Sequence, residues 1–186
     1  MDGTILWLTG LSGSGKTTLA TAVAARLRRV RPVEILDGDE IRKQLSPELG
    51  FAREDRELNV GRIGFVARLL ARHGVFAIAA AISPYASSRN EIRRLAASEG
   101  IRFVEVFLDA ELQCLVDRDV KGLYKRALAG ELPNFSGISD PYEAPTHPEI
   151  VVRTDREAPD VSAQRILDAL VVLGVVVSDT DQTSSV

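Results

Sequence analysis

The chain has 186 residues, and its 23 basic and 26 acidic side chains give a formal net charge of −3 at pH 7. Hydrophobic residues make up 45% of the sequence and charged residues 26%, which is typical of one folded domain and excludes a globally disordered chain. A mildly acidic chain disfavours nucleic-acid binding through overall charge, although it leaves room for a local basic pocket.

Cysteine usage and the apolar segments give expectations about location. Cys114 is the only cysteine, so no internal disulfide bond can form, which favours the reducing cytoplasm. The amino terminus, Met1-Asp2-Gly3, is acidic where a signal peptide would be basic. The longest apolar stretches, 75–82 and 169–177, are far shorter than the roughly 20 residues that span a bilayer. We therefore expect a cytoplasmic protein with no membrane partner.

Short apolar runs alternate with longer segments of helical periodicity, a pattern typical of a parallel sheet wrapped by helices. The apolar runs predict strands at 4–9, 33–36, 75–81, 103–108 and 150–153. Apolar residues recur at helical spacing in three segments, namely Leu19, Val23 and Leu27, then Ile63, Val66, Ala67 and Leu70, and finally Ile166, Leu170 and Leu173. Ser88 and Glu91 form a capping-box pattern that predicts the start of a further helix, and Gly174 predicts the end of the last one.

Two adjoining segments interrupt this rhythm. Residues 118–131 are charged and interrupted by glycine, and residues 132–148 contain four prolines. Connections of this length inside a compact domain are usually working loops, so we expect residues 118–148 to form a lid over a site. We predict a single domain over residues 1–177 and a frayed polar tail over residues 178–186.

The first predicted strand is followed directly by Gly10-Leu11-Ser12-Gly13-Ser14-Gly15-Lys16-Thr17, which fits the phosphate-binding pattern G-x-x-x-x-G-K-[ST]. In this pattern the glycines let backbone N–H groups point at phosphate oxygens, the lysine reaches the β- and γ-phosphates, and the hydroxyl binds Mg²⁺. The alternative is a chance glycine-rich turn, which is expected in fewer than about 1% of chains of this length. The sequence therefore predicts a nucleoside triphosphate site in a P-loop NTPase-type α/β fold, with three layers and a mostly parallel sheet of about five strands covered by helices on both faces.

Other sequence patterns narrow the class of reaction. No Asn-Lys pair is present for the base-reading motif of a GTPase, and the signature L-S-G-G-Q of transporter ATPases is absent. A D-x-x-G pattern occurs at 119–122, but it follows the fourth predicted strand within the basic lid, which is the wrong context for a switch loop. Small-molecule kinases remain.

Asp37-Gly38-Asp39 stands at the end of the second predicted strand, and Arg42 follows shortly after it. Carboxyl ends of parallel strands line the ligand crevice of such a sheet. Two carboxylates there can orient an acceptor hydroxyl, take its proton or hold Mg²⁺ through water. The alternative is an Asx turn that caps the next helix. The position beside the phosphate loop favours the functional interpretation.

A helix face and a strand end supply further candidates. Arg56, Asn59 and Arg62 lie three residues apart and would suit an anionic acceptor, although a solvated helix face is the more common explanation. Pro84 ends the third strand and leaves Ser83 at the crevice edge, where the serine binds the acceptor, accepts a phosphoryl group or only satisfies a backbone group. The lid cations either neutralise charge during phosphoryl transfer or form a solvated helix; they are Arg118, Lys121, Lys125 and Arg126.

Seven motifs, taken in order, resemble the adenylylsulfate kinase family, and the resemblance runs from about Leu6 to Leu173. They are G-L-S-G-S-G-K-T-T, D-G-D-x-x-R, F-x-x-x-D-R-x-x-N, I-S-P-Y, F-x-E-V-F-x-D, R-D-x-K-G-L-Y-K and N-F-S-G-I-x-D-P-Y-E-x-P. The resemblance implies ATP-dependent phosphorylation of the 3′-hydroxyl of adenosine 5′-phosphosulfate (APS) to give 3′-phosphoadenylyl sulfate and ADP in sulfate activation. It also implies Mg²⁺ and a homodimer, and it leaves room for an association with ATP sulfurylase.

The resemblance assigns site residues at matching positions. It implies ATP contacts from the phosphate loop and one lid residue, namely Gly10, Ser12, Gly13, Ser14, Gly15, Lys16, Thr17, Thr18 and Arg118. It implies acceptor contacts from Asp39, Arg42, Phe51, Arg56, Asn59, Ile82, Ser83, Lys121, Leu123 and Phe135, with the two phenylalanine rings sandwiching the adenine of the acceptor. The implied catalytic residues are Lys16, Asp37, Asp39 and Ser83, and the implied magnesium site is Thr17 with Asp37.

Three positions depart from the family pattern. Gly61 stands where an arginine is usual, Phe65 replaces a common acidic residue and Ala52 a common hydroxyl, and none of them is a catalytic position.

Two alternatives remain: a kinase of another small hydroxyl compound, such as a nucleoside, shikimate or gluconate, and an inactive paralogue that binds ATP without transferring phosphate. The phenylalanine pair argues against the first, and the intact phosphate loop and aspartate pair argue against the second.

Overall fold

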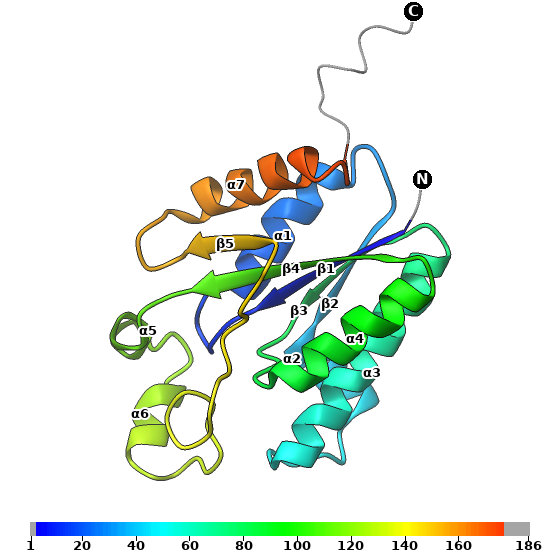
Figure 1. Cartoon of the computed structure of the whole chain (residues 1–186). Helices are drawn as coiled ribbons and strands as arrows, with labels where there is room; N and C mark the ends of the chain where they lie inside the picture. The colour runs from blue at the N-terminus through cyan, green and yellow to red at the C-terminus, as the bar shows by residue number, and fades with distance from the viewer. Residues whose placement is uncertain (1–2, 177–186) are drawn as a thin grey trace, which may run out of the picture.

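The computed structural model describes residues 3–176, in which a five-stranded parallel sheet lies between two layers of helices (Figure 1). The strands are β1 (Thr4–Thr9), β2 (Val33–Asp37), β3 (Phe76–Ala80), β4 (Arg102–Asp109) and β5 (Ile150–Arg153). Their order in the sheet is β2-β3-β1-β4-β5, and every pairing is parallel. The predicted fold class is confirmed, and each predicted strand is present to within one residue at either end. The tail predicted at 178–186 lies outside the described residues.

Two helical layers cover the sheet. α1 (Lys16–Leu27) and α7 (Pro159–Val172) pack on one face, and α3 (Arg53–Arg72) and α4 (Ala86–Ser98) pack on the other (Figure 1). Side chains of a strand point alternately to the two faces, so Leu6 and Leu8 of β1 join the first core while Ile5 and Trp7 join the second. All six residues of β1 are buried, as expected for a central strand of a parallel sheet.

The strand order gathers the candidate site at one end of the sheet. The chain passes from β1 to β2 at one edge, returns to β3, and then crosses β1 to reach β4. A crevice for ligands forms where the direction of such connections reverses, beyond the carboxyl ends of the strands. The segments that follow β1, β2 and β3 therefore meet there, and they carry the phosphate loop, Asp37 and Ser83.

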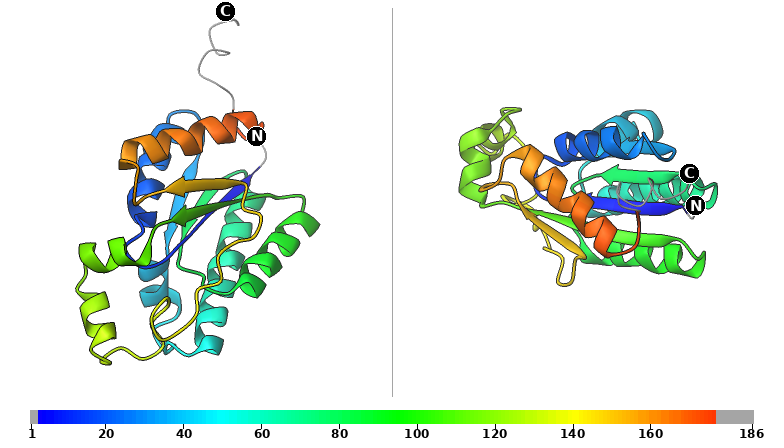
Figure 2. Two further views of the ribbon diagram at one scale, coloured as in Figure 1. Left: turned by 60° about the vertical axis from the view of Figure 1, so that its left-hand side comes forward. Right: turned by 90° about the horizontal axis from the view of Figure 1, so that it is seen from above.

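Three short helices lie near this end. α2 (Gly38–Leu45) follows β2, while α5 (Leu112–Arg118) and α6 (Leu123–Leu128) follow β4. Figure 2 shows α6 and the long loop after it projecting beyond the end of the sheet. Within residues 3–176, no helix has both the length and the apolar character that a bilayer crossing requires.

The helix ends correct one prediction and confirm another. The capping box at Ser88 and Glu91 is wrong: α4 begins two residues earlier, at Ala86, whose backbone N–H donates to the distant Glu143 carboxylate at 2.7 Å. A carboxylate from another part of the chain thus replaces the local cap. Gly174 follows the end of α7 as predicted, with a φ of 66° that glycine adopts without strain.

Candidate active site

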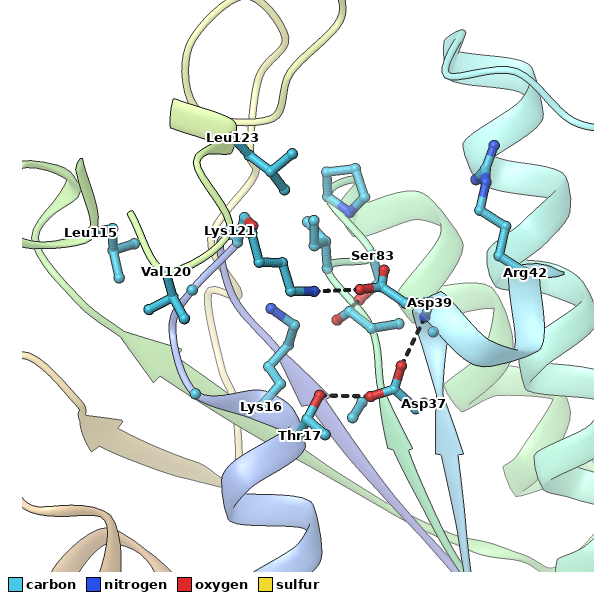
Figure 3. Close-up of a pocket in the computed structure, with 18 of the residues that line it drawn as sticks. Lys16, Thr17, Asp37, Asp39, Arg42, Ser83, Leu115, Val120, Lys121 and Leu123 are labelled. Carbon is cyan, nitrogen blue, oxygen red and sulfur yellow. Dashed lines mark hydrogen bonds and ion pairs between the residues drawn. The ribbon is translucent and has the colours of Figure 1, made fainter. Parts of the chain in front are cut away.

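A cavity of about 290 Å³ lies between the carboxyl ends of β1, β2 and β3 and the lid (Figure 3). Most residues predicted for the site line it, namely Ser12, Gly13, Gly15, Lys16, Thr17, Thr18, Asp37, Asp39, Arg42, Phe51, Arg56, Asn59, Ile82, Ser83, Lys121 and Leu123. Four predicted residues do not line it: Gly10, Ser14, Arg118 and Phe135.

The phosphate loop takes its shape from two glycines. Gly15 immediately precedes α1 with a φ of 91°, which side chains of L-residues rarely allow. A Cβ at Gly10 would lie 2.8 Å from the carbonyl oxygen of Leu108, so only glycine allows β1 and β4 to approach there. Ser14 is buried within the loop. Gly10 and Ser14 therefore shape the loop from outside the cavity.

Lys16 is turned back onto the loop that carries it. Its ammonium group donates to the carbonyl oxygens of Gly10 at 2.9 Å and Leu11 at 2.8 Å. Burial, with a smaller contribution from neighbouring Lys121, lowers the pKa of Lys16 to about 8, and Asp39 and Asp37 only partly oppose this shift. Two carbonyl oxygens therefore accept the hydrogen bonds of the Lys16 ammonium group, which the sequence pattern predicts to bind phosphate.

Asp37 combines the two roles that the sequence left as alternatives. Its Oδ1 accepts the backbone N–H groups of Asp39 at 2.9 Å and Glu40 at 3.3 Å, and so caps α2. Its Oδ2 accepts the Thr17 hydroxyl at 2.6 Å (Figure 3). Burial by itself would raise the pKa of Asp37, but these hydrogen bonds outweigh it and lower the pKa below the usual value. The carboxylate is therefore ionised at neutral pH.

Lys121 and Tyr124 of the lid both contact the site. Lys121 Nζ donates to Asp39 Oδ2 at 2.6 Å, across the mouth of the cavity (Figure 3). The Tyr124 hydroxyl donates to the carbonyl oxygen of Ser12 in the phosphate loop at 2.8 Å. Burial and the charge of Asp119 raise the pKa of Tyr124 to about 12, which keeps this donor protonated. In this structure the lid is closed.

The other predicted lid cations lie outside the cavity. Arg118 donates to the carbonyl oxygen of Thr154 at 2.9 Å, which holds the end of α5 against the segment after β5. Arg126 pairs with Glu131 at 3.2 Å, and Lys125 is exposed. Asp119 lies at the start of the D-x-x-G pattern, and its carboxylate accepts the N–H groups of Tyr124 and Lys125. Asp119 thus supports α6, and of the four cations Lys121 alone enters the cavity.

The acceptor side of the cavity contains Arg42, Phe51 and Arg56. The Arg42 guanidinium carbon lies 4.5 Å from the centroid of the Phe51 ring, and that of Arg56 lies 5.5 Å from it. Arg56 also donates to the carbonyl oxygens of Phe51, at 3.1 Å, and of Asn134. Arg56 therefore joins the segment that carries Phe51 to the segment that carries Phe135.

The two predicted aromatic rings do not form a pair in this structure. Phe51 is 58% exposed at the cavity, whereas the Phe135 ring lies edge-on against Tyr124, with the centroids 5.2 Å apart. The hydrogen bonds of Arg56 bring the backbones of both segments together, but the Phe135 ring packs against Tyr124 and does not line the cavity. The ring clamp stays a prediction.

The helix face of Arg56, Asn59 and Arg62 divides between two roles. Asn59 is 8% exposed, lines the cavity, and its Oδ1 has no hydrogen-bond partner within the described residues. Arg62 points elsewhere and donates to the carbonyl oxygen of Leu45 and to Glu48, both at 2.6 Å. Arg62 thus holds the connection between α2 and α3, while the amide oxygen of Asn59 stays buried at the cavity without a partner among the described residues.

The Ser83 hydroxyl belongs to a buried hydrogen-bond network. It accepts the indole N–H of Trp7 at 3.0 Å and donates to Thr9 Oγ1 at 3.1 Å. The residue is 1% exposed and has a φ of 41°, which is unusual for serine. Arg89 donates to its carbonyl oxygen at 2.6 Å and so holds this turn. These contacts favour the structural role among the three that the sequence left open.

Sequence patterns gave no role to several residues that support the site. Arg89 is 2% exposed and also donates to Glu105 at 2.8 Å and to the carbonyl oxygen of Glu143 at 2.6 Å. Asp140 accepts the Tyr85 hydroxyl at 2.7 Å and lies 3.9 Å from Arg56 Nε. Tyr85 belongs to the motif I-S-P-Y, and Asp140 belongs to the motif N-F-S-G-I-x-D-P-Y-E-x-P. The sequence alone does not show that these two side chains meet.

Comparison with known proteins agrees with this geometry. The family model described as adenylylsulphate kinase matches residues 2–153. An adenylyl-sulfate kinase of Myxococcus xanthus is 62% identical over 168 residues, which are 90% of this chain and 91% of that protein. A protein of Sorangium cellulosum named as a probable bifunctional SAT/APS kinase is 54% identical over 95% of this chain and 30% of its own length.

Solved structures give the same result. The structure of a Mycobacterium tuberculosis APS kinase in complex with AMPPNP and APS superposes with a TM-score of 0.86 at 42% identity, covering 91% of this chain and 98% of that one. The phosphate loop, the aspartate pair and the lid occur here on the predicted fold, and the matching model and relatives cover most of the chain. The chain therefore belongs to the adenylylsulphate kinase family, whose members are ATP-dependent kinases of adenylyl sulfate.

Proposed function

We propose that the chain transfers the γ-phosphoryl group of ATP to the 3′-hydroxyl of APS, giving 3′-phosphoadenylyl sulfate and ADP. The observation that carries this proposal is the single cavity where Lys16 and Thr17 face Asp39, Arg56 and Asn59. Phosphate-binding groups and acceptor-binding groups lie there on opposite walls. Such an arrangement suits in-line transfer between two bound nucleotides.

On the donor wall, the backbone around Gly13 and Gly15 and the Lys16 ammonium group bind the triphosphate, while Thr18 lies beside them. Lys16 exchanges its carbonyl partners for phosphate oxygens when ATP binds. The lowered pKa of Lys16 supports this exchange, because anionic phosphates stabilise the ammonium form that burial disfavours. Arg118 would contact ATP only after its hydrogen bond to the carbonyl oxygen of Thr154 breaks.

The Thr17 hydroxyl and the Asp37 carboxylate fit a magnesium ion. Mg²⁺ is commonly held by one or two carboxylates, water and substrate phosphates, and Asp37 is ionised beside the phosphate loop. The described residues contain no cluster of three or more acidic, histidine or cysteine ligands, which agrees with a site completed by the substrate. When bound, the ion would neutralise charge on the β- and γ-phosphates.

On the acceptor wall, Arg42, Arg56 and Lys121 supply positive charge for the phosphosulfate, and Asn59 supplies an unpartnered amide oxygen. Ile82, Ser83 and Leu123 complete the surface around the acceptor. Phe51 stacks on one face of the adenine in place of Arg42. Phe135 reaches the other face only if it leaves its contact with Tyr124.

The transfer step balances with the residues at hand. The 3′-oxygen of the acceptor bonds to the γ-phosphorus, the bond from γ-phosphorus to the bridging oxygen breaks, and ADP leaves with that electron pair. We assign the hydroxyl proton to Asp39, because both oxygens of Asp37 already accept hydrogen bonds, from Thr17 and from the backbone. Positioning contributes more than base strength to a loose transition state of this kind.

The proposal has four further features. A homodimer follows from the family resemblance, and an association with ATP sulfurylase is supported by the bifunctional relative. A cytoplasmic location rests on the single cysteine, Cys114. The same family resemblance supports one kinase domain over residues 1–177.

The proposal is tested by ADP release from ATP and Mg²⁺, with APS compared against nucleosides, shikimate and gluconate. Of these acceptors, we expect only APS to support turnover. We expect Lys16→Ala to abolish this turnover while the circular dichroism spectrum stays unchanged. Phe135→Ala should raise KM for APS far more than KM for ATP. Equal losses for the two substrates would assign Phe135 to packing against Tyr124, and turnover with another acceptor would overturn the assigned reaction.

A further inference from the structure

A buried hydroxyl lies where the phosphate loop meets the acceptor wall. Thr9 is the last residue of β1, is 0% exposed and directly precedes Gly10 of the phosphate loop. Its backbone is paired with Phe107 of β4, which fixes it to the centre of the sheet. Ile82 and Ser83, which line the acceptor wall, belong to the segment that follows β3. Thr9 thus stands between the two walls, although it does not line the cavity itself.

Backbone pairing between β1 and β3 ends just before the site. The register runs to Leu8 opposite Ala80, and the N–H of Ala81 then donates to the carbonyl oxygen of Leu8 at 3.2 Å. One residue further along both strands, the Thr9 hydroxyl donates to the carbonyl oxygen of Ile82 at 2.7 Å. A side chain therefore continues the connection that the backbone began. This hydrogen bond ties the start of the phosphate loop to the start of the acceptor segment.

The Thr9 hydroxyl uses its whole hydrogen-bonding capacity. A threonine hydroxyl has one proton to donate and two lone pairs that accept. The proton goes to the carbonyl oxygen of Ile82, which can only accept. The Ser83 hydroxyl at 3.1 Å and the Tyr142 hydroxyl at 3.0 Å therefore both donate to Thr9. Burial raises the pKa of Tyr142 to about 12, so this donor keeps its proton at neutral pH. The phosphate loop, the acceptor wall and the lid thus meet at one oxygen atom.

We propose that Thr9 is a positioning residue for phosphoryl transfer, whose hydroxyl holds the phosphate loop and the acceptor wall at the separation that in-line transfer requires. The kinetic part of this inference rests on the proposed reaction. Next to Thr9, the carbonyl oxygen of Gly10 accepts from Lys16 at 2.9 Å, so one short segment fixes both the hydroxyl and the phosphate-binding lysine. Loss of the hydroxyl would misalign two bound nucleotides without removing a contact to either.

Thr9→Val tests this role, because it removes the hydroxyl and keeps the shape of the side chain. We expect kcat for transfer to APS to fall by about 10- to 100-fold, since small misplacements of bound reactants have effects of this size. KM for ATP and KM for APS should each stay within about threefold. Rates are expressed per ATP-binding site, counted by equilibrium binding of ATP. A merely structural threonine would lower the number of sites and leave kcat per site unchanged.

Two further variants separate the hydroxyl from the bulk of the side chain. Thr9→Ser keeps the hydroxyl and should retain kcat to within about threefold. Thr4→Val makes the same change at a buried threonine at the opposite end of β1, which is 3% exposed, and should leave kcat unchanged. A loss in either variant as large as that in Thr9→Val would overturn the assignment to the Thr9 hydroxyl.

Tyr142→Phe tests the contribution of the lid. It removes one of the three partners of the Thr9 hydroxyl and leaves the hydrogen bond to Ile82, so we expect kcat to fall only about fivefold. Adding Tyr142→Phe to Thr9→Val should lower kcat by no more than about twofold further, because both side chains act through the same oxygen. Independent losses that multiply in the double variant would overturn this shared route.

Hydrogen exchange tests the tie without reference to the reaction. In the protein without ligand, exchange of residues 81–86 should accelerate at least about tenfold in Thr9→Val and stay unchanged in Thr9→Ser. Unchanged exchange in Thr9→Val would overturn the proposal, and so would faster exchange with an unchanged kcat per site. Absence of turnover with APS in the unmodified protein would instead overturn the proposed function, and exchange would still decide whether Thr9 joins the two segments.

Discussion

Lys121 Nζ lies 2.6 Å from Asp39 Oδ2, although the two residues are 82 positions apart in the chain. Both side chains are more than half exposed, so this ion pair contributes at most about 1 kcal/mol to holding the lid closed. The cavity beneath it, of about 290 Å³, is at the lower end for a single small ligand. Two nucleotides therefore require the lid to open, and a weak ion pair permits it.

We expect Lys121→Ala to loosen the lid of the empty protein and to lower kcat, because the side chain holds Asp39 before binding and faces the transferred phosphoryl group afterwards. Hydrogen exchange of residues 119–131 should accelerate several-fold without ligand, and kcat should fall by about 10- to 1000-fold.

The control is Lys125→Ala, on the same segment but exposed and outside the cavity. It should leave both exchange and kcat close to those of the unmodified protein. An unchanged exchange rate in Lys121→Ala would show that the contact of Tyr124 with Ser12 closes the lid without help.

The pKa of about 8 at Lys16 predicts how ATP binding depends on pH. Below that pH the free enzyme carries the ammonium form that phosphates require, and above it the amine is neutral. We therefore expect kcat/KM for ATP to fall about tenfold per pH unit once the pH exceeds about 8. Bound phosphates raise the pKa again, so kcat should stay level to a higher pH.

Lys16→Arg provides the comparison, because its guanidinium group stays charged throughout this range. The variant should be slower, but its kcat/KM profile should lack the inflection near pH 8. An inflection that persists in Lys16→Arg would belong to another group.

Asn59 keeps a buried oxygen without a partner, which costs stability in the empty protein. Leucine has a shape similar to that of asparagine but no polar group, so we expect Asn59→Leu to raise the free energy of unfolding by about 1 kcal/mol. We also expect KM for APS to rise at least tenfold while KM for ATP changes little. Urea unfolding and initial rates measure the two effects.

The exposed Asn90 of α4 is the matched position. Asn90→Leu should alter neither KM value. If Asn59→Leu destabilised the protein and raised both KM values equally, the side chain would be structural.

Ser83→Ala separates a structural serine from a covalent phosphoserine. It leaves the buried Trp7 N–H without an acceptor, so we expect a loss of about 1–3 kcal/mol in the free energy of unfolding. Trp7 is the only tryptophan, so its fluorescence follows unfolding and reports on its own surroundings. Transfer to APS should persist within about tenfold.

Ser87→Ala, at an exposed position at the start of α4, should change neither property. Complete loss of transfer in a folded Ser83→Ala protein would support a phosphorylated serine.

Sequence periodicity predicted the sheet well because the central strands β1 and β3 are buried on both faces and read as apolar runs. Short sequence motifs predicted the phosphate loop and Asp37, because the chemistry of both depends on residues that are neighbours in the chain. The capping-box pattern failed at Ser88, because α4 is capped by a residue 57 positions away from Ala86. The sequence did not distinguish the roles of Arg56 and Arg62, because both lie on one helix face and differ only in the distant residues they contact. Contacts between distant segments decide such roles, and local pattern does not contain them.

Glu143 fixes how the lid can move. Its carboxylate accepts the N–H of Ala86, its N–H donates to the carbonyl oxygen of Pro84 at 2.8 Å, and its carbonyl oxygen accepts from Arg89. These three hydrogen bonds tie one end of the lid to the turn of Ser83 and to the start of α4. We expect the lid to open by a swing of the portion between Arg118 and Asp140, which carries Tyr124 and Phe135 together. Donor and acceptor entrances would therefore be uncovered in a single movement.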